Sequence, residues 1–303
     1  MRGRVSCLVY HRVGNPSEEP FLTRGGSPVI QAEQLESELS FLKAIGAHFA
    51  TFADLRNGWF PSPDEIGVIV SFDDGFRSTY GAGLDVLERI GIPAVIFQAT
   101  AMIGAGSLLW EHALSWHTRD ERTTARFHDV VRAARPDLGT PPGADLATQL
   151  RKRVPAPEVE LLLSDARSAF GDAAEQSAVA RRIYPAPADV LRARDRGHEI
   201  GSHGDRHYRR ETIDDATFEQ DLERSVEALE ALLGAPPAAF AYPFNSYRPG
   251  DDALVGRHFR QAATVDRRVI ERSTDPLWLP RFTWPGDPPN RLRQRRWLLT
   301  GNV

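Results

Sequence analysis

The sequence predicts an α/β protein with a mostly parallel sheet, either open or closed into a barrel. Strand-like and helix-like stretches alternate near both ends of the chain. Residues 105–187 interrupt this alternation and read as helices and loops. Short polar clusters directly follow several of the expected strands, and sheets of this class bind their ligands at the carboxyl ends of the strands. The three observations together favour an α/β fold with a ligand site at one end of its sheet.

The N-terminal part of the chain contains three expected strands and two expected helices. The apolar runs at 5–11 and 67–75 read as buried strands, and residues 93–100 form the third. Helices are expected over 31–46 and 78–91, because apolar side chains recur there every three or four residues and each stretch stops at a glycine.

After the interruption, the alternation of strands and helices resumes. The helix expected over 213–233 has apolar residues at helical spacing, and Gly234 fits its end. Thr212 and Asp215 fit a capping box at its start. The expected strands of this part are 197–203, 238–244 and 261–265.

We expect a single domain over residues 1–303, with residues 105–187 as a helical insertion within it. The insertion follows the strand at 93–100, so it leaves the sheet on the ligand-binding side, where additions commonly shape specificity. Trp110 and Trp116 lie in this segment and offer rings that stack on sugars. Packing inside the insertion is the favoured interpretation of both side chains.

Composition and charge exclude several classes of protein. The chain has 303 residues, 41% of them hydrophobic and 26% charged, as in ordinary globular proteins. Its net charge of −4 gives no indication of a nucleic-acid partner. The single cysteine, Cys7, lies in an apolar run and excludes an intrachain disulfide. No segment reads as a secretory signal or a membrane span, so we expect a cytoplasmic protein.

The polar clusters at the strand ends have the composition of a metal site. His203 and His207 are four residues apart, so both imidazoles can face one point. With one carboxylate of the pair Asp73 and Asp74, they form an N,N,O set that leaves coordination positions open, as in catalytic zinc sites. The second carboxylate is then free to accept a proton from water.

Four motifs occur along the chain in the order YHRVG (10–14), SFDDGF (71–76), GHEIGSHGDRH (197–207) and FAYPF (240–244). In these motifs the sequence resembles the polysaccharide deacetylases, also called the NodB-homology group or carbohydrate esterase family four, over about residues 1–104 and 188–285. The resemblance implies a distorted (β/α)7-type barrel with a metal-dependent de-N-acetylase site.

The resemblance also implies a role for each residue of the site. Asp73 corresponds to the general base, and Asp74, His203 and His207 to the ligands of a divalent metal. Zn²⁺ is the expected ion, with Co²⁺, Ni²⁺ and Fe²⁺ as alternatives. The implied reaction is attack of metal-bound water on an amide carbonyl, which releases acetate and an amine.

The substrate groove is implied by the segment after the strand at 238–244. Tyr242, Pro243 and Phe244 resemble its wall, and the backbone N–H of Phe244 is the expected donor to the oxyanion. Trp284 is expected to line the same groove.

The sequence departs from the family at three positions that affect the chemistry. Ala241 replaces the arginine that orients the base in many relatives, and we expect Arg281 to take over that contact. The late Leu-x-His motif, which supplies the general acid, is absent. His11 is our candidate for this acid, with a structural histidine as the alternative. Gly204 stands where sugar deacetylases often have threonine or serine.

The leading functional hypothesis is a metal-dependent hydrolase that removes an N-acetyl or N-acyl group from an amino sugar or glycan. One alternative is an amidohydrolase of the same fold that acts on a small intracellular molecule, such as a natural-product intermediate or a cyclic amide. Another is a non-catalytic member that keeps a carbohydrate-binding groove. The expected partner is therefore an N-acetylated sugar, glycan or small molecule, and neither nucleic acid nor a membrane.

Overall fold

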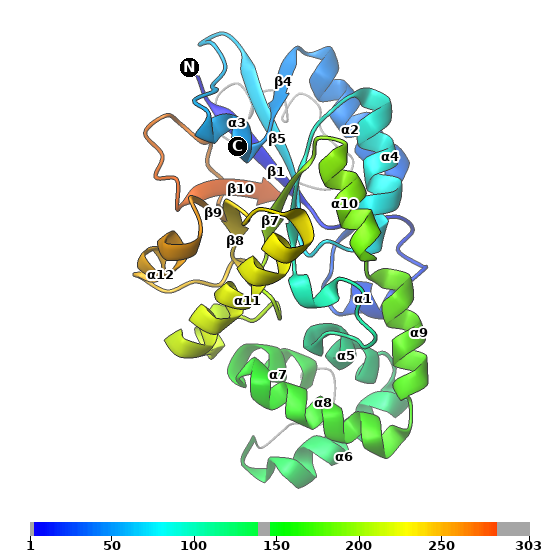
Figure 1. Cartoon of the computed structure of the whole chain (residues 1–303). Coiled ribbons are helices and arrows are strands. Elements are labelled where there is room, and N and C mark those ends of the chain that lie inside the picture. The colour runs from blue at the N-terminus through cyan, green and yellow to red at the C-terminus, as the bar shows by residue number, and fades with distance from the viewer. Residues whose placement is uncertain (1–2, 139–145, 284–303) are drawn as a thin grey trace.

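The computed structural model describes residues 3–138 and 146–283. Within these residues, seven parallel strands close a barrel in the order β1-β10-β9-β8-β7-β6-β5, with β5 pairing back to β1 (Figure 1). The seven-stranded barrel predicted from the sequence is therefore confirmed. Its strands are β1 (Val5–Tyr10), β5 (Ile66–Phe72), β6 (Val95–Gln98), β7 (Glu199–Ser202), β8 (Ala239–Ala241), β9 (Gln261–Val265) and β10 (Leu279–Thr283).

Strand β5 organises the barrel, because it pairs on both of its edges. One edge pairs with β1 along its length, and the other pairs first with β4 (Ala47–Ala50) and then with β6. The register places Tyr10 beside Phe72, and the N–H of Asp73 donates to the Tyr10 carbonyl at 2.9 Å. The residues that follow β1 and β5 therefore meet at the carboxyl end of the barrel.

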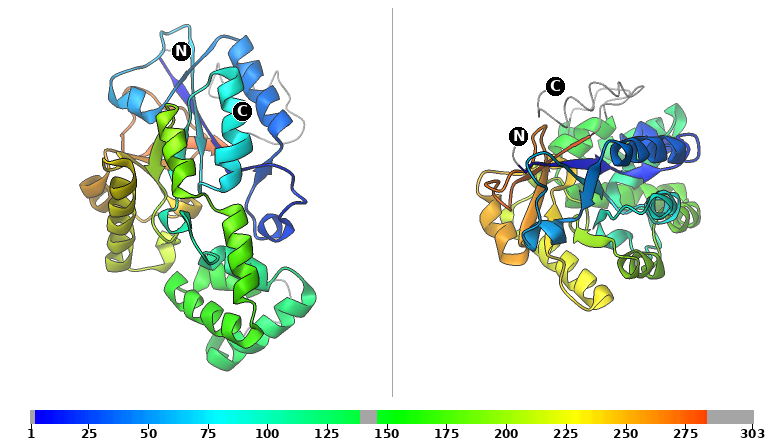
Figure 2. Two further views of the ribbon diagram at one scale, coloured as in Figure 1. Left: turned by 45° about the vertical axis from the view of Figure 1, so that its right-hand side comes forward. Right: turned by 90° about the horizontal axis from the view of Figure 1, so that it is seen from above.

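Helices surround the barrel and bury one apolar face each (Figure 2). On α2 (Ala32–Ala44), Leu35, Leu39 and Leu42 recur at helical spacing and are buried against the strands. Burial of each such side chain stabilises the fold by roughly 1.5–3 kcal/mol relative to exposure. The other outer helices are α1 (Pro20–Arg24), α3 (Phe52–Arg56), α4 (Leu84–Ile90), α10 (Pro187–Asp195), α11 (Asp215–Leu233) and α12 (Asp251–His258).

Short elements complete the described part of the chain. A π-helical turn (Thr79–Gly83) leads into α4. Two-residue strands β2 (Arg12–Val13) and β3 (Val29–Ile30) pair in parallel beside the barrel. Single 3₁₀ turns occur at Thr100–Met102, Pro136–Leu138, Arg210–Thr212 and Pro243–Asn245.

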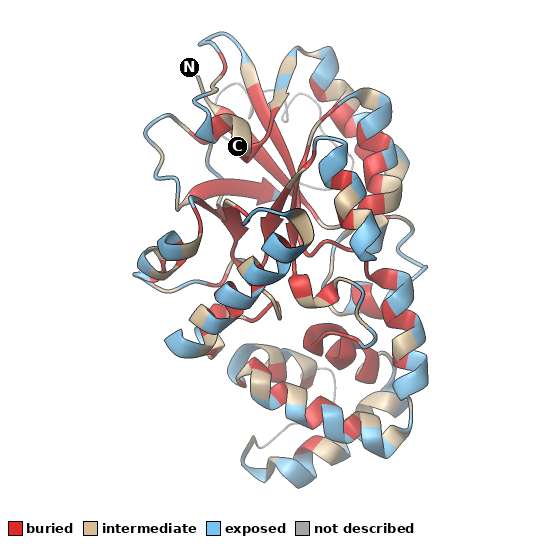
Figure 3. Cartoon of the chain, viewed as in Figure 1, coloured by how far each residue is buried: buried red, intermediate tan, exposed pale blue. Residues whose placement is uncertain are grey.

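The insertion forms a helical layer across the carboxyl end of the barrel. Figure 3 shows α5 (Trp110–His117) buried between the barrel and the other insertion helices, and all of its residues are buried. One hydrophobic cluster runs from these helices through to Phe240 and Tyr242 of the barrel. Insertion and barrel thus share a core. The remaining helices are α6 (Glu121–Ala134), α7 (Leu146–Arg153), α8 (Ala156–Phe170) and α9 (Ala173–Ile183).

Two sequence expectations concern single residues of these helices. The capping box expected at Thr212 and Asp215 is wrong, because Asp214 is the N-cap of α11 and accepts the N–H of Thr217. Thr212 instead donates its hydroxyl to the Arg209 carbonyl. Trp110 and Trp116 are both buried within the shared core, as expected.

No helix in the described ranges is long and apolar enough to cross a membrane.

Candidate active site

A tight turn after β5 directs two neighbouring carboxylates into one pocket. Asp74 has a φ of +69° and Gly75 a φ of +77°, so the backbone reverses directly after the strand. A Cβ at residue 75 would lie 2.0 Å from Oε1 of Gln98, so only glycine fits there. Asp73 and Asp74 are both buried, at 4% and 6% exposure.

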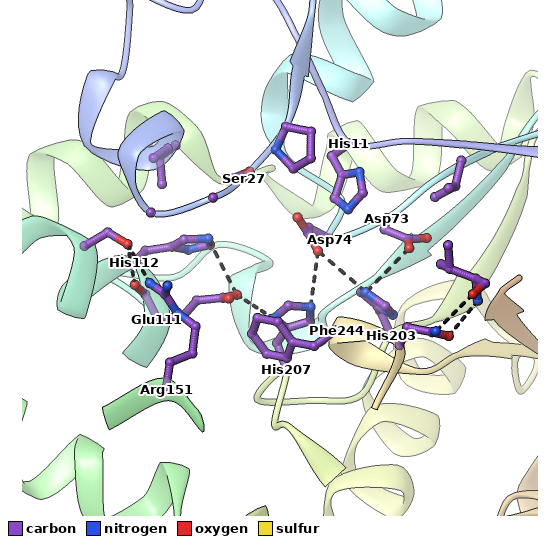
Figure 4. Close-up of a pocket in the computed structure, with 18 of the residues that line it drawn as sticks. His11, Ser27, Asp73, Asp74, Glu111, His112, Arg151, His203, His207 and Phe244 are labelled. Carbon is purple, nitrogen blue, oxygen red and sulfur yellow. Dashed lines mark hydrogen bonds and ion pairs between the residues drawn. The ribbon is translucent and has the colours of Figure 1, made fainter. Parts of the chain in front are cut away.

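Asp74, His203 and His207 converge at the carboxyl end of the barrel (Figure 4). Each offers a ligand atom, and these atoms lie within 4.8 Å of one another. Oδ1 of Asp74 is 3.2 Å from Nε2 of His207 and 3.6 Å from Nε2 of His203. Two imidazoles and one carboxylate within this distance match the donor set of a catalytic divalent-metal site.

The tautomer of His203 suits metal binding. Its Nδ1 lies 2.7 Å from the carbonyl oxygen of Ala241, which can only accept, so Nδ1 carries the proton. The lone pair of Nε2 then faces Asp74. Burial lowers the pKa of His203 to about 4, so the ring is neutral at physiological pH.

His207 lies between two carboxylates. Its Nδ1 is 2.5 Å from Oε1 of Glu111, which comes from α5 of the insertion, and its Nε2 faces Asp74. Burial by itself would lower the pKa of His207, but Glu111 and Asp74 outweigh it and raise this pKa to about 10. The site therefore stabilises a positive charge at this position, as either a proton or a metal ion.

Arg281 forms a two-point ion pair with Asp73, the contact that the sequence predicted. Its Nη1 and Nη2 donate to Oδ1 and Oδ2 of Asp73 at 2.6 and 2.8 Å, and Nη1 also donates to the hydroxyl of Ser71 at 3.1 Å. Burial would raise the pKa of Asp73, but Arg281 and His203 outweigh it and hold this pKa below its usual range. Asp73 is thus an ionised carboxylate that Arg281 holds in a fixed orientation.

A pocket of ≈ 290 Å³ opens beside these groups. His11 lines it, and the hydroxyl of Thr79 in the π-helical turn donates to the His11 carbonyl at 2.9 Å. The His11 Nδ1 is buried and has no hydrogen-bond partner in the described part of the chain. The ring is therefore placed at the reaction site without a structural hydrogen bond at that nitrogen.

The segment after β8 forms another wall of the pocket. Tyr242 and Phe244 line it, while Pro243 is buried behind them. Phe244 has a φ of +57°, and its N–H has no acceptor among the residues that the structure describes. This N–H is thus free to bind a substrate oxygen. Trp284, which the sequence places in the groove, lies outside the described residues.

The model of the polysaccharide deacetylase family matches residues 165–253, a range that contains His203 and His207. Over these residues the chain is similar to the polysaccharide deacetylases. A search of curated proteins found no match.

Solved structures of several deacetylases share the fold over nearly the whole chain. The Streptococcus pyogenes deacetylase PplD in complex with acetate is 15% identical, with a TM-score of 0.62, and the match covers 97% of this chain and 98% of that one. A de-N-acetylase from Aggregatibacter actinomycetemcomitans is 16% identical, with a TM-score of 0.60 and coverage of 96% and 99%. IcaB from Ammonifex degensii is 17% identical, with a TM-score of 0.59 and coverage of 98% of each chain.

The insertion supplies pocket residues that the family resemblance did not indicate. Glu111, His112, Ser115 and Arg151 all line the cavity and all come from α5 or α7. Glu111 and His112 interrupt an otherwise apolar run, LLWEHAL. Charged residues are rarely buried unless they have a partner, so this interruption is a signal that sequence reasoning could have used.

Proposed function

We propose that this protein is a metal-dependent hydrolase that removes an N-acetyl group from an amino sugar or glycan. The observation that supports this best is the arrangement of Asp74, His203 and His207 beside an arginine-held Asp73. The three ligands favour Zn²⁺, with Co²⁺, Ni²⁺ and Fe²⁺ as alternatives. A divalent ion held there would act as a Lewis acid and lower the pKa of a water molecule.

The chain's own residues divide the remaining chemistry. Asp73 lies 3.9 Å from Nε2 of His203, close enough to the triad to accept a proton from the attacking water. Arg281 keeps its carboxylate ionised and oriented. The N–H of Phe244 stabilises the oxygen that becomes negative when water adds to the carbonyl.

His11 completes the reaction as the proposed general acid. It lines the pocket from the end of β1 and replaces the missing histidine of the late Leu-x-His motif. In this role it donates a proton to the nitrogen as the C–N bond breaks. The products are acetate and a free amine.

Glu111 positions His207 in the proposed site. A carboxylate beside Nδ1 of a metal-binding histidine fixes the tautomer and the ring orientation and makes Nε2 a better ligand. Oε1 of Glu111 lies 2.5 Å from Nδ1 of His207, an ion-pair contact that supports this role. The insertion thus contributes to the metal site itself as well as to the pocket wall.

The size of the pocket supports a second candidate, the same hydrolysis on a small N-acylated molecule. At ≈ 290 Å³ the cavity is at the small end of ligand pockets, which typically measure about 300–1,000 Å³. It fits one sugar unit better than a length of polymer.

A panel assay tests the proposed function. Release of acetate or free amine is measured from N-acetyl sugars, nucleotide sugars, chito-oligomers and cyclic amides, with and without a chelator. We expect release from at least one N-acetyl sugar, loss on chelation and recovery with Zn²⁺. Asp74→Ala and His207→Ala should lose bound metal, whereas Asp73→Asn should keep metal and lose turnover. Full metal content in both ligand variants would contradict the assignment.

A further inference from the structure

The active-site pocket has one cationic side chain that the proposed chemistry does not use. Among the described residues that line the pocket, Arg151 is the only lysine or arginine, whereas Asp73, Asp74 and Glu111 supply three carboxylates. Arg151 extends from α7 of the insertion towards the side of the pocket where Glu111 and His112 lie (Figure 4). A cation at this place needs an explanation of its own.

The carboxylates of the pocket are engaged with other groups. Asp73 pairs with Arg281, and both Asp74 and Glu111 contact His207. Nη2 of Arg151 donates to the hydroxyl of Ser115 at 3.3 Å, a neutral partner. Within the described ranges, no carboxylate lies at ion-pair distance from Arg151.

An incompletely paired guanidinium in a pocket favours an anionic ligand. Arginine has five N–H donors in a planar fork that matches the oxygens of a carboxylate or a phosphate. Arg151 is only partly exposed, and a partly buried charge is stabilised when an opposite charge joins it. Most of its donors remain available, because the 3.3 Å contact to Ser115 is its one side-chain hydrogen bond among the described residues.

The walls around Arg151 restrict what can reach it. The loop after α1 approaches α5 so closely that a Cβ at Gly25 would lie 2.1 Å from Oγ of Ser115. From the same loop, Ser27 also lines the pocket, and its buried hydroxyl has no partner among the described residues. The α1 loop and the insertion therefore both contribute walls to the pocket, and Arg151 lines the same cavity as the triad.

We propose that Arg151 and Ser115 form a subsite for an anionic group, a carboxylate or a phosphate, on the substrate. The inference rests on the proposed function, because the acetyl group must lie at the triad for the anionic group to reach Arg151. The substrate is then an acidic N-acetylated sugar unit, and neutral amino sugars bind more weakly.

Equilibrium binding to the whole protein tests the subsite without requiring turnover. Calorimetry compares N-acetylglucosamine 6-phosphate, N-acetylmuramic acid and N-acetylglucosamine, which carry a phosphate, a carboxylate and no charge. We expect at least one acidic sugar to bind ten-fold or more tightly than the neutral one, and the two acidic probes distinguish phosphate from carboxylate. Arg151→Gln should abolish the preference, and Arg151→Lys should retain part of it.

Arg153→Gln is the matched control, because Arg153 is exposed on the same helix. It removes one positive charge and should leave the preference unchanged. Thermal unfolding checks that Arg151→Gln is folded; if it is not, the comparison of sugars on the unaltered protein and on Arg151→Lys decides. Equal affinity for the three sugars, no binding of either acidic sugar, or a preference that survives Arg151→Gln would overturn the subsite.

Acetate release separates this inference from the proposed function. Acidic sugars that bind through Arg151 but release no acetate with any metal contradict the proposed function and leave the subsite in place. Equal release from acidic and neutral sugars, unaffected by Arg151→Gln, contradicts the subsite and supports the hydrolase.

Discussion

At the scale of single residues, Glu111 is the strongest addition that the structure makes to the expected site. It is buried, comes from a helix of the insertion and lies 2.5 Å from a proposed metal ligand, His207. Its charge has two effects on metal binding. It orients His207 and strengthens it as a ligand, and it also raises the pKa of His207, so a proton competes better with the metal at low pH.

Glu111→Gln should therefore lower metal affinity by an amount that grows with pH. In the unaltered protein, affinity should keep rising as the pH approaches about 10, the pKa of His207. In the variant this pKa falls, so affinity should level off at a lower pH and end about 10–100-fold weaker. Zn²⁺ affinity is measured by competition with a chelator across the pH range.

The control for Glu111→Gln is Glu175→Gln, an exposed glutamate on α9 of the same insertion. It should leave the whole affinity curve in place. Parallel curves for the unaltered protein and Glu111→Gln would show that Glu111 is merely structural.

We expect Arg281 to determine the pH range in which Asp73, the proposed base, accepts a proton. The pair lowers the pKa of Asp73, so it stabilises the folded protein above the unfolded pKa of about 3.9 and loses this effect as pH falls. Without Arg281, burial raises the pKa of Asp73 instead. In the profile of log(kcat/KM) against pH, Arg281→Gln should shift the acidic limb to a pH about 1–3 units higher.

Arg281→Gln also leaves a buried carboxylate unpaired, which costs about 3–5 kcal/mol of folding free energy. The double variant Asp73→Asn with Arg281→Gln controls for this, since it should regain stability without activity. Arg257→Gln, which removes an exposed arginine paired with Glu219, should change neither quantity. An acidic limb that stays in place in Arg281→Gln would reject Asp73 as the base.

At the scale of elements, three helices hold the loop that contains His203 and His207. From α5, Nε1 of Trp110 donates to the carbonyls of Arg206 and His207. From α11, Asp221 accepts the N–H groups of Asp205 and Arg206 at 3.1 and 2.8 Å. From α8, Glu160 accepts from Arg206 and from the hydroxyl of Tyr208. Insertion and barrel helices therefore fix the geometry of the proposed metal ligands together.

This packing gives Gly204 a local explanation. Gly204 stands where sugar deacetylases often have threonine or serine. In the structure, Gly204 has a φ of +74°, and a Cβ there would lie 2.4 Å from Oδ2 of Asp221. A side chain would therefore displace the carboxylate that holds the loop.

Gly204→Ala should destabilise the protein more than an ordinary left-handed glycine does. Gly197→Ala is the matched control, because Gly197 has a φ of +87° and no atom within 4 Å of an added Cβ. We expect a loss of about 1 kcal/mol for the control, from backbone strain alone, and at least about 2 kcal/mol for Gly204→Ala. Urea unfolding measures both, and equal losses would exclude the contact with Asp221 as the cause.

At the scale of the whole molecule, local patterns predicted the parallel sheet and the meeting of the triad, because polar residues directly after parallel strands must gather at one end. Alternating elements left an open sheet or a barrel as alternatives, and the family resemblance favoured the barrel. Arg281 was expected because a buried base needs a partner and the usual arginine position holds Ala241. Glu111 and Arg151 were missed, because their contacts with the site depend on how the insertion packs. Sequence spacing within the insertion does not show which residues of the barrel its helices contact.

The shared core leads to a prediction about the insertion as a unit. Replacement of residues 105–186 by a short linker would expose the hydrophobic cluster that joins α5 to Phe240 and Tyr242. It would also remove the contacts of Trp110, Glu111 and Glu160 with the loop that contains His203 and His207. We expect the shortened chain to lose cooperative thermal unfolding and bound Zn²⁺ together. Hydrogen exchange should show the loss of protection to be greatest at the carboxyl end of the barrel, around β8 and residues 203–208. A shortened chain that unfolds cooperatively, keeps its metal and changes only in substrate preference would mean that the insertion is a specificity element on an independent barrel.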